Sequence, residues 1–327
     1  MSTLLIYTGG TIGMIKRDQG SLAPFSLNEM LTHCPVLAAK VANQQVECLT
    51  LQPVKDSTDI NPDNWISLRN LILSHHTSHE NVLILHGTDT MAYSSSALSF
   101  LMLDFNKNIV FTGSQIPIWE ENSDGNSNII HALQVLDQLV LNKVRAQTLL
   151  CFNGKTFKGN RVSKISTSSF DAFSGSEFMF TEEQHPSKYN GVFKYIEKIE
   201  TDVSLIKMYP GIQLENLIDY LLATPPKGIL LESFGTGNIP TNNSFKNGLK
   251  KLIANGVIVL NISQCSGGYI NMEKYESGLQ LLNIGVINGK NMSGEAAISK
   301  LMMTLSISGY SKAEILITTI AGETTTA

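Results

Sequence analysis

Two threonines stand where a hydroxyl group could do chemistry. Thr11 follows an apolar run at residues 4–7 and two glycines, and Thr88 follows an apolar run at residues 82–85. A threonine hydroxyl becomes a nucleophile when a base takes its proton, and a lysine held neutral and oriented by a carboxylate can act as that base. Lys164, in the polar segment 159–164, is the candidate lysine. Together these residue types fit covalent catalysis by a hydroxyl group.

Each of these residues also has a structural use. A threonine between a strand and a helix commonly caps the helix, so Thr11, Thr88 and the neighbouring Asp89 fit that role as well. A lone lysine in a polar segment is usually solvated. His86 stands where a catalytic base could stand, but its place against a strand favours a structural role. The residues by themselves leave these alternatives open.

Small polar residues follow several predicted strands, at the point where each strand ends. Such runs begin at Thr8, Gly87, Thr112, Gly235 and Ser263. In open parallel sheets the ligand crevice lies outside the carboxyl ends of the strands. Hydroxyl groups and backbone N–H groups gathered there suit a small, polar, zwitterionic molecule.

The elements that must position these residues alternate between strand and helix along the chain. Strands are predicted at residues 4–7, 46–51, 82–85, 109–111, 148–152, 228–231 and 257–262. Helices are predicted from Ser26 to a stop before Pro35, after Asn61, and at residues 91–103, 128–140, 214–222, 245–253 and 295–307. Residues 153–190 are expected to form a long polar loop. The pattern predicts a larger N-terminal α/β domain with a mainly parallel sheet (1–190), a linker (191–211) and a smaller C-terminal parallel α/β domain (212–327).

Composition narrows the functional class. The 327 residues carry a net charge of −4 and no dense basic run, so nucleic acid is not an expected partner. No apolar run reaches the length of about 18 residues that a membrane span needs, and the N-terminus has no secretory pattern. Pro240 stands where a dinucleotide fingerprint at residues 235–237 would need its third glycine.

Neither a disulfide framework nor a metal site is indicated. Four cysteines lie far apart and are expected to be reduced thiols of a cytoplasmic protein; they are Cys34, Cys48, Cys151 and Cys265. His75, His76 and His79 are spaced like metal ligands but lack a matching carboxylate cluster, so a solvated helix end is the favoured interpretation.

Two motifs carry a resemblance to a known family, TGGTIG at residues 8–13 and HGTDTM at residues 86–91. They resemble the signature motifs of the bacterial-type L-asparaginases, and the variant is similar to the cytoplasmic type I branch. Further matches lie at residues 56–59, 113–117, 159–161, 164, 170–173, 264–265 and 271–272. The similarity extends from residue 4 to beyond residue 297.

The resemblance implies hydrolysis of L-asparagine to L-aspartate and ammonia, with no metal or cofactor. By position, Thr11 is the primary nucleophile, and Thr88, Asp89 and Lys164 form a second group that activates a nucleophile or water. The implied substrate-binding residues are Asp56, Ser57, Thr58, Thr88, Asp89, Gly113, Ser114 and Asn238. The family's site is closed by the neighbouring subunit of an intimate homodimer, often within a tetramer, and Asn238 matches a residue contributed that way.

The chain departs from the family pattern in two places. Ser21 stands near a position where many relatives have a tyrosine that assists the nucleophile. Glu232 replaces an arginine of the regulatory asparagine site found in some type I enzymes, although Cys265 matches another position of that site. Two other functions remain as alternatives, an amidotransferase-type subunit in a tRNA-linked pathway and a non-catalytic amino-acid binder.

Overall fold

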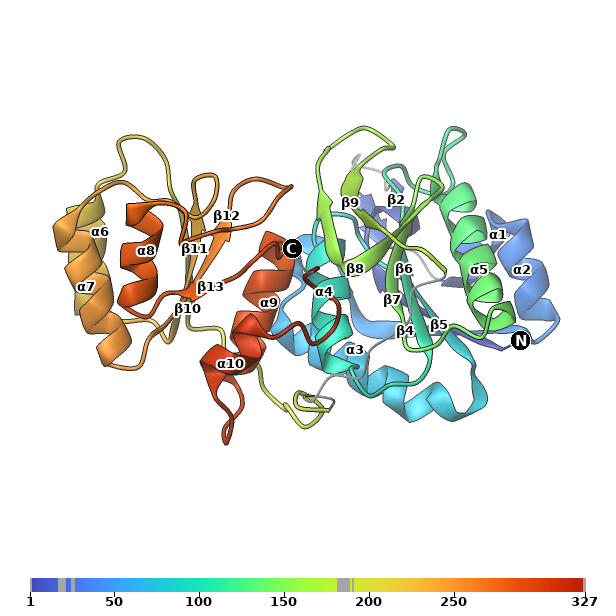
Figure 1. Cartoon of the computed structure of the whole chain (residues 1–327). Coiled ribbons are helices and arrows are strands. Elements are labelled where there is room, and N and C mark those ends of the chain that lie inside the picture. Colours follow the sequence, from blue (N-terminus) through green and yellow to red (C-terminus); the bar gives the residue numbers. More distant parts are fainter. Residues whose placement is uncertain (1, 17–21, 25–26, 181–188, 190, 326–327) are drawn as a thin grey trace. The chain divides into compact units, whose positions relative to one another are not determined.

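A computed structural model gives the fold of the chain (Figure 1). It describes residues 2–16, 22–24, 27–180, 189 and 191–325. The chain divides into two compact units, Met1–Pro186 and Ser187–Ala327. Each unit is built on its own sheet, so each is described by itself.

The larger unit contains a sheet with the strand order β4-β1-β5-β6-β7-β8-β9. Strands β4, β1, β5, β6 and β7 are parallel, and β8 and β9 continue the sheet as antiparallel strands. The strands are β1 (Thr3–Gly9), β4 (Val46–Lys55), β5 (Asn81–Leu85), β6 (Asn108–Thr112), β7 (Thr148–Phe152), β8 (Lys155–Lys164) and β9 (Phe173–Glu177). A separate hairpin pairs β2 (Met14–Lys16) with β3 (Leu22–Pro24).

Helices cover both faces of this sheet because its strands are apolar on both sides. On one face α3 (Pro62–His75) contacts α4 (Met91–Leu101), and on the other α2 (Pro35–Ala42) contacts α5 (Gly125–Leu141) (Figure 1). Leu5 and Tyr7 of β1 belong to a core cluster that includes Leu133 and Leu136 of α5. Short helical segments are α1 (Leu27–Thr32), η1 (Thr11–Gly13), η2 (Ser57–Asp59) and η3 (His76–Ser78).

Local sequence signals set the helix starts. Asn61 caps α3 by accepting from the N–H groups of Asp63 and Asn64, as predicted for this helix. Pro35 behaves differently from the prediction, because it opens the new helix α2 instead of only ending the preceding one. Proline is well suited to the first turn of a helix, where its missing N–H needs no partner.

The predicted long loop at 153–190 is wrong over much of its length, since it contains β8 and β9. These strands lack an apolar alternation because close packing requires small residues in them. A Cβ on Gly159 would lie 3.1 Å from the Ser95 Cβ of α4, and a Cβ on Gly175 would lie 2.1 Å from the Arg161 carbonyl oxygen. This matters for the site because Lys164 is the last residue of β8 and is therefore held by a strand instead of a loop.

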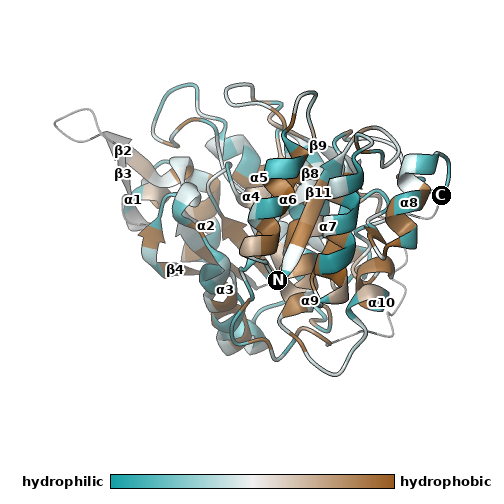
Figure 2. Ribbon diagram, turned by 90° about the vertical axis from the view of Figure 1, so that its left-hand side faces the viewer, coloured by the Kyte–Doolittle hydropathy of each residue, from teal (hydrophilic) through white to brown (hydrophobic). Residues whose placement is uncertain are grey.

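The smaller unit has a parallel sheet in the order β10-β11-β12-β13. Its strands are β10 (Val203–Lys207), β11 (Gly228–Ser233), β12 (Ile258–Ser263) and β13 (Ile287–Asn288). Its helices are α6 (Leu214–Ala223), α7 (Asn243–Ala254), α8 (Glu276–Asn283), α9 (Gly294–Leu305) and α10 (Lys312–Ile317). In α7 the buried Phe245, Leu249 and Leu252 recur at helical spacing, and Figure 2 shows the opposite, hydrophilic face of this helix in teal.

The predicted fold class, a larger and a smaller α/β domain, is confirmed. Strand β10 lies inside the segment 191–211, so ordered sheet structure of the second unit begins within the predicted linker. A fully buried ion pair fixes the end of this unit, where the Lys300 Nζ of α9 lies 2.5 Å from Glu323 Oε1. Across the described residues, every helix is too short or too polar to span a lipid bilayer.

Candidate active site

The carboxyl ends of β4, β1, β5 and β6 meet backbone against backbone. A Cβ on Gly10 would stand 2.2 Å from the Gly87 Cα, and one on Gly113 would stand 2.2 Å from the His86 carbonyl oxygen. A Cβ on Gly9 would stand 2.0 Å from the Lys55 carbonyl oxygen at the end of β4. Only glycine permits such approaches. The turns that carry Thr11 and Thr88 are therefore pressed together at one edge of the sheet.

Thr11 opens the short helix η1 directly after β1. Its turn is held by the Gly13 N–H, which donates to Gly10 O at 3.1 Å, and by the Ile118 N–H, which donates to Ile12 O at 3.2 Å. Thr11 is half-buried, and its hydroxyl forms no hydrogen bond with any residue the structure describes. A fixed turn thus presents a hydroxyl group that is not committed to capping.

Lys164, Thr88 and Asp89 form a hydrogen-bonded group. The Lys164 Nζ donates to Thr88 Oγ1 at 2.8 Å and to Asp89 Oδ1 at 2.6 Å. The Thr88 side chain is buried, whereas the Asp89 side chain is 56% exposed and has a face open to a ligand. Lys164 meets residues about 75 positions earlier in the sequence because β8 pairs with β7 only from Lys155 to Lys158 and then packs against α4, the helix that begins just after the Thr88–Asp89 turn. The lysine predicted as a base is therefore paired with its predicted partners.

Ser57 and Thr58 lie in η2, just after the end of β4. Asp56 Oδ1 accepts from both the N–H and the hydroxyl of Thr58, each at 2.8 Å. Ser57 is buried under Gly87, where an added Cβ would stand 2.6 Å from Ser57 Oγ. The Thr90 hydroxyl also donates to the Ser57 carbonyl oxygen at 2.7 Å. These contacts bring predicted binding residues to the Thr88 turn.

The Gly113–Ser114 turn is held by residues that the sequence analysis missed. Asp124, just before α5, accepts from the N–H groups of Gln115 and Ile116 at 3.0 and 3.1 Å. Asn128 on the first turns of α5 donates to Gly113 O at 2.9 Å and to Asp124 Oδ2 at 3.0 Å. The position of Asp124 in the sequence could have indicated this role. It precedes a predicted helix, and carboxylates at such positions commonly bind free N–H groups.

Asn238 belongs to the other compact unit, as do the predicted strand ends at Gly235 and Ser263. Its Oδ1 accepts from Ser277 Oγ at 2.8 Å, and its Nδ2 donates to Thr236 Oγ1 at 3.4 Å. The predicted set of polar strand ends is thus divided between two sheets. The ends of β1, β5 and β6 share one sheet, and those of β11 and β12 share the other.

His86 is a structural residue. It is buried, and its Nδ1 lies 2.8 Å from Gly87 O, a carbonyl that can only accept. Burial lowers the pKa of His86 to about 4, against which the hydrogen bond to Gly87 acts weakly. A neutral ring whose Nδ1 proton is fixed to a neighbouring carbonyl stiffens the turn and is poorly suited to accept protons from the site.

This shift predicts a specific loss of stability in mild acid. Above pH 6.5 the ring is neutral in both states, but between pH 6.5 and about 4 only the unfolded chain takes up the proton. The free energy of unfolding should fall across this window by about 3 kcal/mol more than in His86→Asn. Urea unfolding followed by the fluorescence of Trp65 and Trp119 measures it. Parallel pH profiles for the two proteins would contradict this assignment.

The histidines at the end of α3 serve as local caps. His75 and His76 place Nδ1 at 3.1 and 2.7 Å from carbonyls of the preceding turn. His79 is buried and not solvated as expected, with Nε2 at 3.1 Å from Glu47 Oε2. Within the described ranges no group of three or more His, Cys, Asp or Glu side chains is arranged to hold a metal ion.

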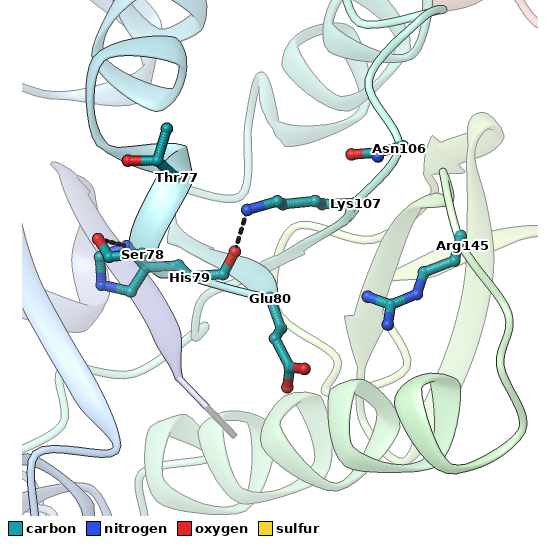
Figure 3. A pocket seen from close by; sticks show the side chains of 7 residues that line it. All are labelled: Thr77, Ser78, His79, Glu80, Asn106, Lys107 and Arg145. Atoms are coloured by element: carbon teal, nitrogen blue, oxygen red, sulfur yellow. Dashed lines mark hydrogen bonds between the residues drawn. The ribbon is translucent and has the colours of Figure 1, made fainter.

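A hollow of about 450 Å³ lies at the opposite edge of this sheet, before β5, β6 and β7 (Figure 3). Its lining residues are Thr77, Ser78, His79, Glu80, Asn106, Lys107 and Arg145. The Lys107 Nζ donates to the carbonyl oxygens of His76 and His79, so it closes the η3 turn. The hollow contains none of the residues predicted to be catalytic.

The four cysteines are free thiols, as predicted. Cys34 and Cys151 are buried, Cys48 is partly buried and Cys265 is exposed. Burial raises the pKa of the Cys151 thiol to about 12, which makes this group inert as a nucleophile. Ser21, predicted to stand in place of an assisting tyrosine, lies outside the described residues.

Comparison with known proteins assigns the family. Residues 2–189 match the model of the asparaginase N-terminal domain, and residues 202–316 match that of the glutaminase/asparaginase C-terminal domain. The chain belongs to the asparaginase family. The two family domains correspond closely to the two compact units, and the asparaginase N-terminal domain contains Thr11, Thr88 and Lys164.

Individual asparaginases match over nearly their full length. L-asparaginase 1 of Escherichia coli (strain K12) is 34% identical over 318 residues, which cover 93% of this chain and 92% of that protein. The thermostable L-asparaginase of Thermococcus kodakarensis has a TM-score of 0.85 and 28% identity, with complete coverage of both chains. L-asparaginase I of Vibrio cholerae has a TM-score of 0.80 and 30% identity over 99% of each chain.

Proposed function

We propose that this protein is an L-asparaginase, which hydrolyses L-asparagine to L-aspartate and ammonia. One observation carries the proposal most strongly. In a chain of the asparaginase family, the Lys164 Nζ contacts both Thr88 Oγ1 and Asp89 Oδ1, beside the turn that presents the Thr11 hydroxyl. That arrangement supplies a nucleophile, a second hydroxyl with an amine for proton transfer, and an open carboxylate.

The proposed reaction has two stages. The Thr11 oxygen attacks the side-chain amide carbon of asparagine and loses its proton, and the amide nitrogen takes up a proton and leaves as ammonia. Water activated by the Thr88–Lys164 pair then attacks the resulting ester, which releases aspartate and returns the proton to Thr11. The oxyanion that forms in each stage is stabilised by N–H groups of the strand-end turns, each typically contributing about 3 kcal/mol.

Recognition of the substrate rests on its two charged α-groups. The exposed Asp89 carboxylate binds the α-ammonium group, and Ser57 binds the α-carboxylate. Thr58, oriented by Asp56, and the Gly113–Ser114 backbone complete the pocket. An amide without an α-ammonium group cannot form this ion pair with Asp89, so we expect simple amides to be poorer substrates than asparagine.

Substrate binding also affects the base. Asp89 is paired with Lys164 at 2.6 Å in the free protein. A substrate ammonium group on the same carboxylate adds a second cation beside Lys164, and like charges disfavour each other. The substrate ammonium group therefore competes with Lys164 for the Asp89 carboxylate, which couples substrate binding to the Lys164–Thr88 contact.

Assembly, location and cofactors follow the family pattern in this proposal. The enzyme is a homodimer, with tetramers as a further step, and Asn238 of a neighbouring copy completes each site. Ser277 and Thr236 hold the Asn238 amide in place for that contact. The enzyme works in the cytoplasm, in keeping with its free thiols, and needs neither metal nor cofactor.

The two alternatives are less well supported. The three L-asparaginases compared above are matched over 92% or more of their length, which does not favour an amidotransferase-type subunit in a tRNA-linked pathway. A non-catalytic amino-acid binder would need no amine beside Thr88.

An ammonia-release assay over a range of L-asparagine and L-glutamine concentrations tests the proposal. We expect release from asparagine with a hyperbolic concentration dependence, because the Glu232 carboxylate would repel a carboxylate ligand at the family's regulatory site. Asparagine binding by calorimetry with no ammonia formed would identify a binder instead. A sigmoidal curve would show that regulation persists despite Glu232.

A further inference from the structure

The Gln115 side chain connects Thr88 to the segment that follows β8. Thr88 Oγ1 donates to Gln115 Oε1 at 3.3 Å, and Gln115 Nε2 donates to the Ser169 carbonyl oxygen at 3.0 Å. The second contact fixes the orientation of the amide, because a backbone carbonyl can only accept and so requires the NH₂ group. The amide oxygen must therefore face Thr88, where it can only accept the hydroxyl proton.

This orientation determines where the Thr88 proton points. A charged Lys164 has three donors and no acceptor, so at 2.8 Å it donates to the Thr88 oxygen. Among the residues that the structure describes, the Thr88 hydroxyl then donates its proton to Gln115 Oε1. When Lys164 is neutral, its lone pair competes for the same proton. The 3.3 Å contact is long for an O–H···O bond, so the proton is held loosely and can turn to Lys164.

The backbone around Gln115 is unusually well fixed. Its N–H donates to both oxygens of Asp124 at 3.0 Å, and that carboxylate also accepts from Ile116 N and Asn128 Nδ2. Asp124 is buried, so these bonds are shielded from water. The side-chain amide of Gln115 therefore contacts Thr88 from a turn whose backbone is held rigidly.

We propose that Gln115 is a positioning residue for the reaction, which directs the Thr88 hydroxyl proton and so keeps the Thr88 oxygen aligned with Lys164. The inference rests on the proposed asparaginase function and deepens it. Gln115 acts through Thr88 and does not itself bond to the reacting atoms.

The test is steady-state kinetics of ammonia release by Gln115→Met and Gln115→Leu, which keep the side-chain volume but remove the amide. Loss of one hydrogen bond to the proton-transfer group should lower kcat about 10-fold, with KM for asparagine within about twofold of wild type. The ratio of kcat in H₂O to kcat in D₂O should rise, because proton transfer becomes slower. Gln134→Met, an exposed change on α5, is the matched control.

The outcomes separate the two proposals. An inactive wild-type protein overturns the asparaginase function and this inference with it. If the wild type is active and both Gln115 variants have the same kcat and isotope ratio as Gln134→Met, the role of Gln115 is overturned and the proposed asparaginase function is not. An increase in KM with unchanged kcat does so as well, since it would place Gln115 in substrate binding. A variant that does not fold is replaced in the comparison by the other, or by Gln115→Ala.

Discussion

Replacing Thr11 by alanine is expected to abolish ammonia release from asparagine while the larger unit stays folded. The hydroxyl of Thr11 is the only group of the η1 turn assigned a covalent role, and it has no hydrogen bond to another described residue. Its removal therefore costs the structure little. Loss of an enzyme's nucleophile commonly lowers kcat by at least about 10³-fold.

Two companion variants make this result specific. Thr11→Val keeps the shape of the side chain without the hydroxyl and should be as inactive as Thr11→Ala. Thr11→Ser keeps the hydroxyl and should retain measurable activity. Fluorescence of Trp119, whose Nε1 donates to Met14 O at 2.6 Å near this turn, reports whether the turn is preserved. Wild-type rates in Thr11→Ala would exclude Thr11 as the nucleophile.

Lys164→Met should produce the second large loss. Methionine keeps most of the aliphatic chain but removes the amine that lies 2.8 Å from Thr88 Oγ1 and 2.6 Å from Asp89 Oδ1. A positioned general base typically contributes about 10² to 10⁴-fold, and kcat should fall by that amount. Thr88→Val removes the hydroxyl group that links the Lys164 amine to the substrate, and it should lower kcat by a similar factor.

The same strand offers a matched control for Lys164. Lys155 also lies on β8 and also pairs with an aspartate, at 2.8 Å from Asp171 Oδ1, but it contacts no threonine of the site. Lys155→Met removes the same charge from the same strand and should keep activity close to wild type. If both lysine variants lose activity equally, the loss reflects the charge or the strand, and the assigned role of Lys164 is wrong.

The sequence predicted the fold class because the buried strands carry strong local signals. Strands β1, β5 and β6 contain short apolar runs with glycine and threonine at or just after their ends, and alternation with helices implied a parallel sheet. The last two strands of the larger sheet, β8 and β9, were harder to predict from the sequence. Strand β8 uses Gly159 against α4, and its partner β9 uses Gly175 against β8, so neither has the apolar pattern of a strand.

The candidate site was predicted in part. Thr88, Asp89 and Lys164 were expected to act together, and the Lys164 amine donates to the side chains of both Thr88 and Asp89. The roles of Gln115 and Asp124 were not foreseen, because a glutamine or aspartate in a turn has many uses and its partners are set by tertiary packing. Sequence motifs pointed to candidate groups for chemistry, whereas the contacts of the residues around them required coordinates.

The most direct test of the central claim is a crystal structure with L-aspartate bound. The account predicts that the hydroxyls of Thr11 and Thr88 both lie about 3 to 3.5 Å from the side-chain carboxyl carbon of the ligand, on opposite sides of it. Asp89 should contact the ligand's α-ammonium group, with the Lys164 amine still hydrogen-bonded to Thr88. An aspartate whose side chain lies beyond reach of either threonine hydroxyl, or which binds away from this edge of the sheet, would contradict the account.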